Sequence, residues 1–357
     1  MAALFQEIKQ RLWNDIMSGR FVTRLPPEPE LALIYEVSRM TLRRSLAELV
    51  SEGFLDARPG QGTFIRRERR TEGSSKTIGL LIVPYLVDGV ADPYFGTIFT
   101  ALAARLGAAG YLLTYAPSPE FLVPSAPTVG DGSLRRPVDG VVAAAFDQYT
   151  AWSIANIQAP MVLLQGVPLP GRSNVLTDDR HGITAAVQHL VELGHRRIAH
   201  IHGSLSATPG QERLLAWRNA LVQRGLPADD MLVGSGKFTV ESGIEAMNTL
   251  WNSGQPRPTA VVCANDKTAF GVYRWAAANG VRIPQDLSVT GFDDLETAQY
   301  LTPALTTVRV PYVRLAEMVC ETLLTEIAQS PGEHVAVTRR ADTELVIRQS
   351  TMPPTQV

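Results

Sequence analysis

The sequence predicts a small α+β domain at the N-terminus, followed by a large α/β domain of two doubly wound lobes. Apolar residues recur at helical spacing over the first fifty residues, whereas beyond residue 76 strand-length apolar runs alternate with helical patterns. The charge differs as well: residues 1–70 carry 12 basic and 9 acidic side chains, a net +3, and the remainder carries 21 and 26, a net −5. A short basic part joined to a long acidic one suggests a nucleic-acid-binding module attached to a body with another task.

The composition excludes several protein classes. A chain of 357 residues with 45% hydrophobic content is long enough for two or more cores. No apolar stretch reaches the roughly 20 residues of a membrane span, and the charged, amphipathic N-terminus lacks the pattern of a signal peptide. We therefore expect a cytoplasmic protein with no membrane partner. The two cysteines, Cys263 and Cys320, lie within apolar patterns, which predicts buried thiols rather than disulfides or metal ligands.

Three helices and a hairpin are predicted for residues 1–66. The first helix has an apolar residue at every fourth position from Leu4 to Ile16. The second begins after two prolines and is expected to bury Leu31, Leu33 and Ile34. Beyond the third helix, short alternating runs surround Pro59–Gly62, which is the pattern of a β-hairpin. Helices followed by such a hairpin predict a winged helix-turn-helix.

The third helix carries the basic residues that such a domain would use. Ser38 is expected to cap its N-terminus, and Arg39 and Arg43 lie four residues apart and therefore on one face, flanked by Thr41 and Arg44. Side chains at the start of a recognition helix reach base edges, where arginine binds guanine through two hydrogen bonds. An arginine-bearing face can also be merely solvated, but its combination with a hairpin wing favours binding to double-stranded DNA.

Residues 4–66 resemble the GntR-type winged-helix DNA-binding domain. The segments that carry the resemblance are LPPEPELALIYEVSRMTLRRSLAELV and RPGQGTFI. The resemblance implies that Arg39 and Arg43 read DNA and that Gly60 and Gly62 shape a wing that enters the minor groove. One departure is Pro29, where the family has an arginine. The predicted DNA contacts are Ser38, Arg39, Thr41, Arg43, Arg44, Gly60, Gln61 and Gly62.

A domain boundary is predicted at residues 67–76, RERRTEGSSK, which are charged and then rich in glycine and serine, as in a flexible linker. This gives a DNA-binding domain at residues 1–66 and a second domain at residues 77–357. The apolar runs of the second domain are expected to form buried parallel strands with helices on both faces. Among these runs are TIGLLIV, VDGVVAAA, PMVLLQG, TAVVCAND and LSVTGFDD.

Polar and aromatic residues follow these predicted strands, at the sheet edge where open α/β sheets bind ligands. They include Asp92–Phe95, Gln165, Asn265-Asp266 and Asp293-Asp294, and Arg213 opens a later helix. Carboxylates, a carboxamide and a guanidinium beside aromatic rings suit a neutral polyhydroxylated ligand. For Asp266 and Asp294, a role as a helix cap or a solvated loop residue is an equal alternative.

Residues 77–352 resemble the LacI/GalR effector-binding domain, which has the fold of periplasmic sugar-binding proteins. The resemblance rests on DPYFGTI, TDDRHGITAAVQHLVELGHRRIAHI and PTAVVCANDKTAFGVYRWAAANGVRIPQDLSVTGFDDLETAQYLTPALTTVR, among other segments. It implies effector contacts at Tyr94, Phe95, Gln165, Arg213, Phe238, Asn265 and Asp293, with Trp217 adding to an aromatic wall. The departures are residues 116–137, where five prolines disfavour the family's helix, and Ala207, where purine-binding relatives carry an arginine.

These resemblances imply a DNA-binding transcriptional regulator, similar to the arabinose-repressor type, that represses carbohydrate-utilisation genes in response to a sugar. We expect a homodimer that reads a palindromic operator. A nucleoside or purine effector is the first alternative, and a solute-binding protein the second. His195, His200 and His202 are not expected to bind metal, because their placement makes a poor chelate. The sequence contains no Gly-x-Ser-x-Gly elbow, P-loop or His-Glu-x-x-His motif, so neither an enzyme nor a cofactor is expected.

Overall fold

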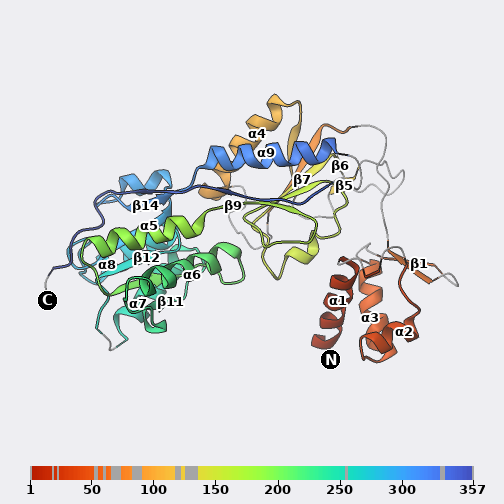
Figure 1. Cartoon of the computed structure of the whole chain (residues 1–357), viewed down its shortest axis with the longest axis horizontal. Coiled ribbons are helices and arrows are strands. Elements are labelled where there is room, and N and C mark those ends of the chain that lie inside the picture. The colour runs from red at the N-terminus through yellow and green to blue at the C-terminus, as the bar shows by residue number, and fades with distance from the viewer. Residues whose placement is uncertain are drawn as a thin grey trace.

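A computed structural model describes residues 2–17, 20–21, 24–51, 55–58, 62–65, 74–82, 91–116, 122–124, 136–253, 256–329 and 334–355. Within these residues the chain forms a small N-terminal unit, here called the head, and a larger body of two lobes (Figure 1). None of the helices in the described ranges is long and apolar enough to span a membrane.

The head is the predicted winged helix. Its elements are α1 (Ala2–Met17), α2 (Glu28–Ile34), α3 (Arg39–Ser51) and the antiparallel pair β1 (Leu55–Arg58) and β2 (Gly62–Ile65). Ile8 and Leu12 of α1 are buried against α3, as the fourfold spacing predicts. The expectation for Leu33 was wrong, since 79% of this residue is exposed. Because α2 spans only seven residues and buries Leu31 and Ala32, Leu33 falls on its outer face.

The N-lobe is built on a parallel sheet flanked by α4 (Pro93–Ala108) and α9 (Tyr312–Ala328). In sheet order its strands are β15 (Thr338–Ala341), β9 (Ser173–Thr177), β8 (Met161–Leu164), β7 (Gly140–Ala144), β3 (Thr77–Ile82) and β4 (Leu112–Ala116). The N-lobe also holds the 3₁₀ turn η3 (Ala151–Ser153). Residues of β7 and β8 are buried throughout, which explains their unbroken apolar sequence.

The C-lobe repeats this plan with helices α5 (Asp179–Glu192), α6 (Thr208–Val222), α7 (Val240–Trp251) and α8 (Asp266–Ala278). In sheet order its strands are β11 (Val233–Gly234), β10 (Ile198–Ile201), β12 (Ala260–Cys263), β13 (Ser288–Asp293), β14 (Thr306–Arg309) and β16 (Glu344–Val346). The last strand pairs antiparallel, and the others pair parallel. The short turns η4 (Asp230–Leu232) and η5 (Glu296–Tyr300) complete the lobe. Two doubly wound lobes confirm the predicted fold class.

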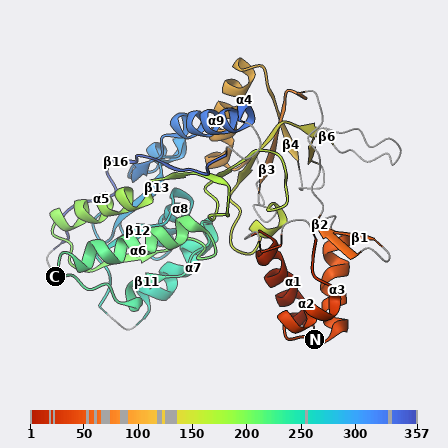
Figure 2. The same ribbon diagram turned by 45° about the vertical axis from the view of Figure 1, so that its right-hand side comes forward.

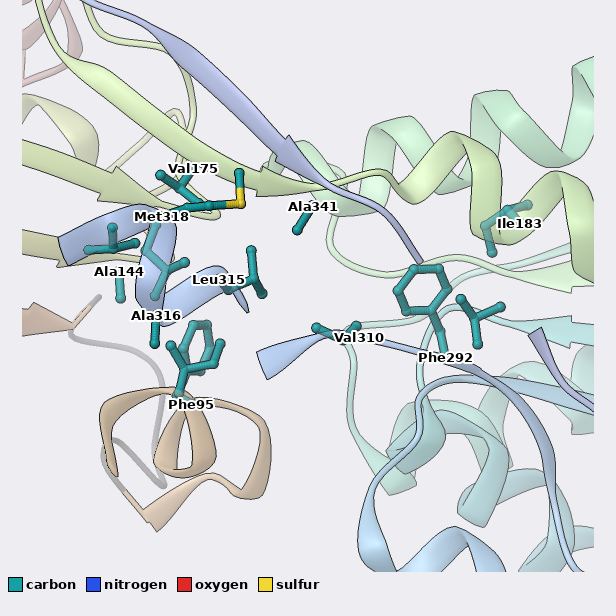
Figure 3. Packing of buried hydrophobic residues seen from close by; sticks show 14 of the residues in the cluster. Phe95, Ala144, Val175, Ile183, Phe292, Val310, Leu315, Ala316, Met318 and Ala341 are labelled. Atoms are coloured by element: carbon teal, nitrogen blue, oxygen red, sulfur yellow. The ribbon is translucent and has the colours of Figure 1, made fainter. Parts of the chain in front are cut away.

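The chain passes between the lobes at residues 177–179, 309–312 and 341–344, and these passages form the hinge. One apolar cluster is continuous across it. Figure 3 shows Val310 and Ala341 at the hinge, with Phe292 on the C-lobe side and Phe95 and Leu315 on the N-lobe side. The hinge therefore joins the two lobes, and the space between them is where a ligand would bind.

Two predicted irregular segments are described only in part. Within residues 116–137, β5 (Leu122–Pro124) pairs parallel with β6 (Arg136–Val138), and most of the rest lies outside the described residues. Of the predicted linker, Ser74 to Lys76 are described, and they are held by one carboxylate. The amides of Ser75 and Lys76 donate to Asp139 at 2.7 and 3.0 Å. Burial acts in the opposite direction, but hydrogen bonds from these residues keep the pKa of Asp139 below its ordinary value.

Candidate functional site

A cavity of about 240 Å³ lies between the lobes, at the carboxyl ends of their strands. Seven of the eight predicted effector contacts line it: Tyr94, Phe95, Gln165, Arg213, Phe238, Asn265 and Asp293. They come from both lobes and from segments far apart in the sequence. The volume is at the small end for a ligand site, so a molecule of the size of a monosaccharide fits better than a large cofactor.

The aromatic wall of the cavity begins at the first turn of α4. Asp92 caps this helix, since its carboxylate accepts from the amides of Tyr94 and Phe95 at 3.0 and 3.3 Å. The two rings meet edge to face with centroids 4.9 Å apart. The amide group of Gln165 lies 2.5 Å from the Tyr94 hydroxyl and also donates to Thr177 at 2.9 Å. The cap and these bonds fix the orientation of the rings.

Several cavity residues have a backbone conformation that L-amino acids rarely adopt. The φ angles of Ala145, Gln165, Phe238 and Asp293 are 62°, 56°, 64° and 116°, and all four residues line the cavity. Such conformations cost about 1–3 kcal/mol each and persist where the surrounding structure enforces them. Their concentration around one cavity marks it as a functional site.

A buried arginine lies between two buried carboxylates. Arg213 is 3% exposed, and its guanidinium lies 3.1 Å from Asp179 and 3.9 Å from Asp293. It also stacks on Phe292, 3.6 Å from the ring centroid. Burial raises the pKa of Asp179 and that of Asp293, although Arg213 opposes both shifts. Within the described residues the buried Nε of Arg213 has no hydrogen-bond partner.

Two further residues of the cavity wall, Asn265 and Lys267, lie at the start of α8. Lys267 of the C-lobe lies 3.3 Å from Asp92 of the N-lobe, so an ion pair joins the lobes at the cavity. Asn265 caps α8 by accepting from the amide of Thr268 at 2.9 Å, and its amide group donates to the carbonyl of Phe238. Asn265 therefore has a structural task as well as a place in the cavity wall.

The prediction for Trp217 was wrong. The side chain is fully buried and does not line the cavity. It stacks on His200 with ring centroids 5.7 Å apart, between α6 and the C-lobe sheet. Trp217 lies four residues beyond Arg213, which places it about 6 Å further along the helix axis. The aromatic wall is formed by Tyr94, Phe95 and Phe238 instead.

Sequence reasoning missed other lining residues: Ala145, Ser204, Pro209, Lys237, Thr239, Lys267 and Leu295. They lie in loops that follow strands or at helix N-termini, so the rule that ligands bind at strand ends could have found them. Asp266 and Asp294 do not line the cavity. Asp266 is fully buried and accepts from the amide of Leu295 at 2.8 Å. Asp294 pairs with Arg309 and Arg348.

The histidines near the sheet have separate structural partners. His195 lies 2.8 Å from Thr259 and 2.9 Å from the carbonyl of Met352. His200 hydrogen-bonds to the carbonyl of Val262 at 2.8 Å, and burial lowers its pKa to about 3. In the part of the chain that the structure describes, no cluster of histidine, cysteine and carboxylate side chains could hold a metal ion.

The candidate DNA-contacting surface is the exposed face of α3. Ser38 accepts from the amide of Thr41 at 3.2 Å, which is the expected cap, and Arg39 is exposed. Nε of Arg43 lies 2.7 Å from a carboxylate oxygen of Glu28, and the guanidinium of Arg44 lies 4.0 Å from the centroid of the Phe5 ring. These contacts hold the two arginines at the surface rather than burying them.

The wing is described in part. Gly62 opens β2 with a φ of 104°, and a Cβ atom there would lie 2.9 Å from the guanidinium of Arg24. The conformation therefore favours glycine here, whereas the flexible Arg24 side chain could move away from a Cβ atom. Arg24 and Arg58 both lie over the ring of Phe64. Gly60 and Gln61 lie outside the described residues.

Family models match both parts of the chain. The model for bacterial regulatory proteins of the gntR family matches residues 4–65, and the model for a periplasmic binding protein-like domain matches residues 187–351. The HTH-type transcriptional repressor PurR of Glaesserella parasuis is 31% identical over 78% of this chain and 82% of its own length. A LacI family transcriptional regulator from Mycobacterium smegmatis is 30% identical, with a TM-score of 0.66 over 78% of this chain and all of the other.

The chain belongs to the LacI family of transcriptional regulators. Within this family member, the DNA-binding head is of the gntR type, so both resemblances expected from the sequence are confirmed. The probable HTH-type transcriptional repressor ExuR of Bacillus subtilis is 32% identical over 59% of this chain and 64% of its own length, just under two thirds. The transcriptional regulator CelR in its cellobiose complex is 26% identical, with a TM-score of 0.68 over 91% of this LacI-family chain and all of the other.

Proposed function

We propose that this LacI-family regulator is a repressor whose affinity for operator DNA is controlled by a small carbohydrate bound between the lobes. The observation that carries the proposal is the cavity, in which aromatic rings and buried hydrogen-bonding groups from both lobes meet, on the same chain as a gntR-type head. The relatives named above are regulators rather than enzymes, which supports a binding function.

The chemistry of the cavity fits a polyhydroxylated ligand. The rings of Tyr94, Phe95 and Phe238 can cover the apolar faces of a sugar, while Gln165, Arg213, Asn265 and Asp293 offer donors and acceptors to its hydroxyls. A LacI family regulator from Enterococcus faecium, 25% identical with a TM-score of 0.65, holds ribose, and CelR holds cellobiose. These neighbours support a sugar as the effector class here, and carbohydrate-utilisation genes as the target.

The head is proposed to read DNA as a pair of copies. Two heads of a homodimer would bind the half-sites of a palindrome, with α3 in the major groove. Arg39 and Arg43 would contact base edges, while Ser38, Thr41 and Arg44 would contact the backbone. The wing, with Gly60, Gln61 and Gly62, would enter the minor groove. Arg43 would then break its ion pair with Glu28 and contact DNA.

Effector control requires that the ligand bind one lobe arrangement more tightly than the other, because equal affinity shifts no population. The lobes are joined by hinge passages and by the pair of Asp92 with Lys267. A sugar that contacts both lobes favours the closed arrangement. Closure would then change the relative position of the two heads on the operator.

A selection and a ligand screen test this proposal together. Full-length protein is incubated with random duplex DNA to select an operator, and its melting temperature is measured against pentoses, hexoses, disaccharides, sugar acids and purines. We expect a palindromic site and a stabilising sugar that Asp293→Ala no longer binds, although that variant still binds the operator. Stabilisation by a purine alone would replace the sugar with a nucleobase effector. If no duplex is selected, the proposed function is wrong.

A further inference from the structure

The body touches the head directly at α1. Ala155 and Trp152 of the N-lobe pack against the apolar cluster of the head, where Trp13 is 5% exposed. Nζ of Lys9 lies 4.8 Å from the centroid of the Trp152 ring, which is a cation–π contact. Figure 2 shows the turn that holds η3 beside α1. The head is therefore seated on a defined part of the body in addition to the chain connection.

The same lysine leads on to the recognition helix. Nζ of Lys9 lies 3.2 Å from a carboxylate oxygen of Glu48 in α3, and the lysine side chain is only 9% exposed. Trp152 of the body, Lys9 of α1 and Glu48 of α3 therefore form an unbroken row of contacts. A largely desolvated ammonium between a ring and a carboxylate is held more firmly than a surface ion pair.

The turn that carries Trp152 is fixed by Asp147, which is 2% exposed. One carboxylate oxygen accepts from the amides of Tyr149 and Thr150, both at 3.0 Å. The other accepts from the hydroxyl of Ser206 at 2.5 Å, and the amide of Gln148 donates to the carbonyl of Ser206 at 3.2 Å. Ser206 belongs to the C-lobe, in the loop before α6. One side chain therefore shapes the turn and joins it to the other lobe.

This loop is also part of the cavity. Ser204 and Ala207, on either side of Ser206, line it, as does Ala145 at the end of β7. Opening the lobes would draw Ser206 away from Asp147 and release the turn. The predicted linker offers no such link at its described end, because Ser75 and Lys76 are tied to Asp139 within the N-lobe itself.

We propose that residues 147–155, here called the relay turn, transmit the lobe arrangement to the DNA-binding head through the contact of Trp152 with α1. This inference rests on the proposed function, because it names how the cavity regulates the head. Closure around a ligand fixes Asp147 through Ser206 and seats the head on the relay turn. Opening releases Asp147 and loosens the head.

Hydrogen exchange of the full-length protein, without ligand or DNA, tests the relay turn. The measured quantity is the exchange rate of amides in α1 and, as an internal reference, in α8. Trp152→Ala removes the contact with the head, and Ser206→Ala removes the hydroxyl that joins the lobes to the turn. Tyr149→Ala removes an aromatic ring that is 68% exposed in the same turn, and Ser253→Ala removes a hydroxyl elsewhere in the C-lobe.

We expect Trp152→Ala and Ser206→Ala each to raise exchange in α1 by about threefold or more, with α8 unchanged. Both controls should exchange like the wild type, and Ser206→Thr, which keeps the hydroxyl, should restore protection. Wild-type exchange in Trp152→Ala would show that the head is not held by the turn. Wild-type exchange in Ser206→Ala, or failure of Ser206→Thr to restore it, would show that the lobe contact does not reach the head. Failure of the protein to select DNA would overturn the proposed function without altering these rates.

Discussion

Replacing Arg213 with methionine removes the cation between two buried carboxylates while keeping most of the side-chain volume. Arg213, Asp179 and Asp293 have side chains that are 3%, 2% and 5% exposed. Removing one partner of a buried charged group leaves the other without compensation, which typically costs about 3–5 kcal/mol. We expect Arg213→Met to lower the free energy of unfolding of the body by this amount at pH 8.

The loss of stability in Arg213→Met should depend on pH, and the two carboxylates determine whether it grows or shrinks as pH rises. Burial already raises the pKa of Asp179 and Asp293, and removal of the guanidinium raises both further. A carboxyl group whose pKa is higher in the folded than in the unfolded state adds no penalty below its unfolded pKa of about 3.9. The penalty grows as pH rises from the unfolded pKa toward the folded pKa, and is complete above the folded value. The deficit of Arg213→Met relative to wild type should therefore be smaller at pH 5 than at pH 8.

Urea unfolding followed by circular dichroism at both pH values measures this deficit. Arg282→Met, which breaks a surface ion pair with Asp286, is the matched control and should change stability little at either pH. Adding Asp179→Asn to Arg213→Met should recover part of the loss at pH 8. An equal deficit at both pH values, with no recovery in the double variant, would refute the reasoning and attribute the loss to packing.

Three other substitutions give separate tests. Arg43→Ala should weaken operator binding by about 1–3 kcal/mol at fixed salt and leave ligand affinity unchanged, because the Arg43 guanidinium lies on the exposed face of α3. Fluorescence anisotropy measures the operator affinity, and an unchanged value would contradict the prediction. Burial raises the pKa of Asp266 to about 7, so the ionisation of this carboxyl should lower stability between pH 6 and 8, and replacing it by Asn should make the melting temperature fall less over this range than in the wild type. If the melting temperatures of the wild type and of Asp266→Asn depended equally on pH, Asp266 would not be the cause of the dependence. Trp217→Phe should lower the melting temperature but keep the affinity for the effector found by screening, since Trp217 is buried outside the cavity. Calorimetry measures this affinity, and a loss of affinity would show that Trp217 contributes to the effector site.

The fold could be predicted because its signals are strong and local. Fully apolar runs such as AVVC have one stable place, inside a sheet covered on both faces, and β12 lies there. Strands with mixed composition were missed. Ser173–Thr177 is entirely buried as β9 although it contains serine, asparagine and threonine: the side-chain amide of Asn174 donates to the carbonyl of Gly166, and the hydroxyl of Ser173 accepts from the amide of Val337.

The residues of the candidate site that lie at strand ends, or that match the family's motifs, could be predicted from the sequence. Arg213 and Asp293 were found, but their joint burial with Asp179 depends on tertiary contacts that no spacing encodes. Trp217 was misplaced because helical position shows which side a residue faces but not how deep it lies. The pairing of Arg43 with Glu28, and the contact of Lys9 with Trp152, join segments whose proximity only the folded chain reveals.

The most direct test of the central claim is the operator affinity of the full-length protein as the effector identified by screening is titrated, measured for wild type and Asp293→Ala. If the cavity controls the head, the wild-type operator dissociation constant should rise by about fivefold or more at saturation, as expected for a coupling of about 1–3 kcal/mol. Asp293→Ala should bind the operator equally well with and without that ligand. An operator affinity of the wild type that does not change at saturating ligand would contradict the claim that the cavity regulates DNA binding.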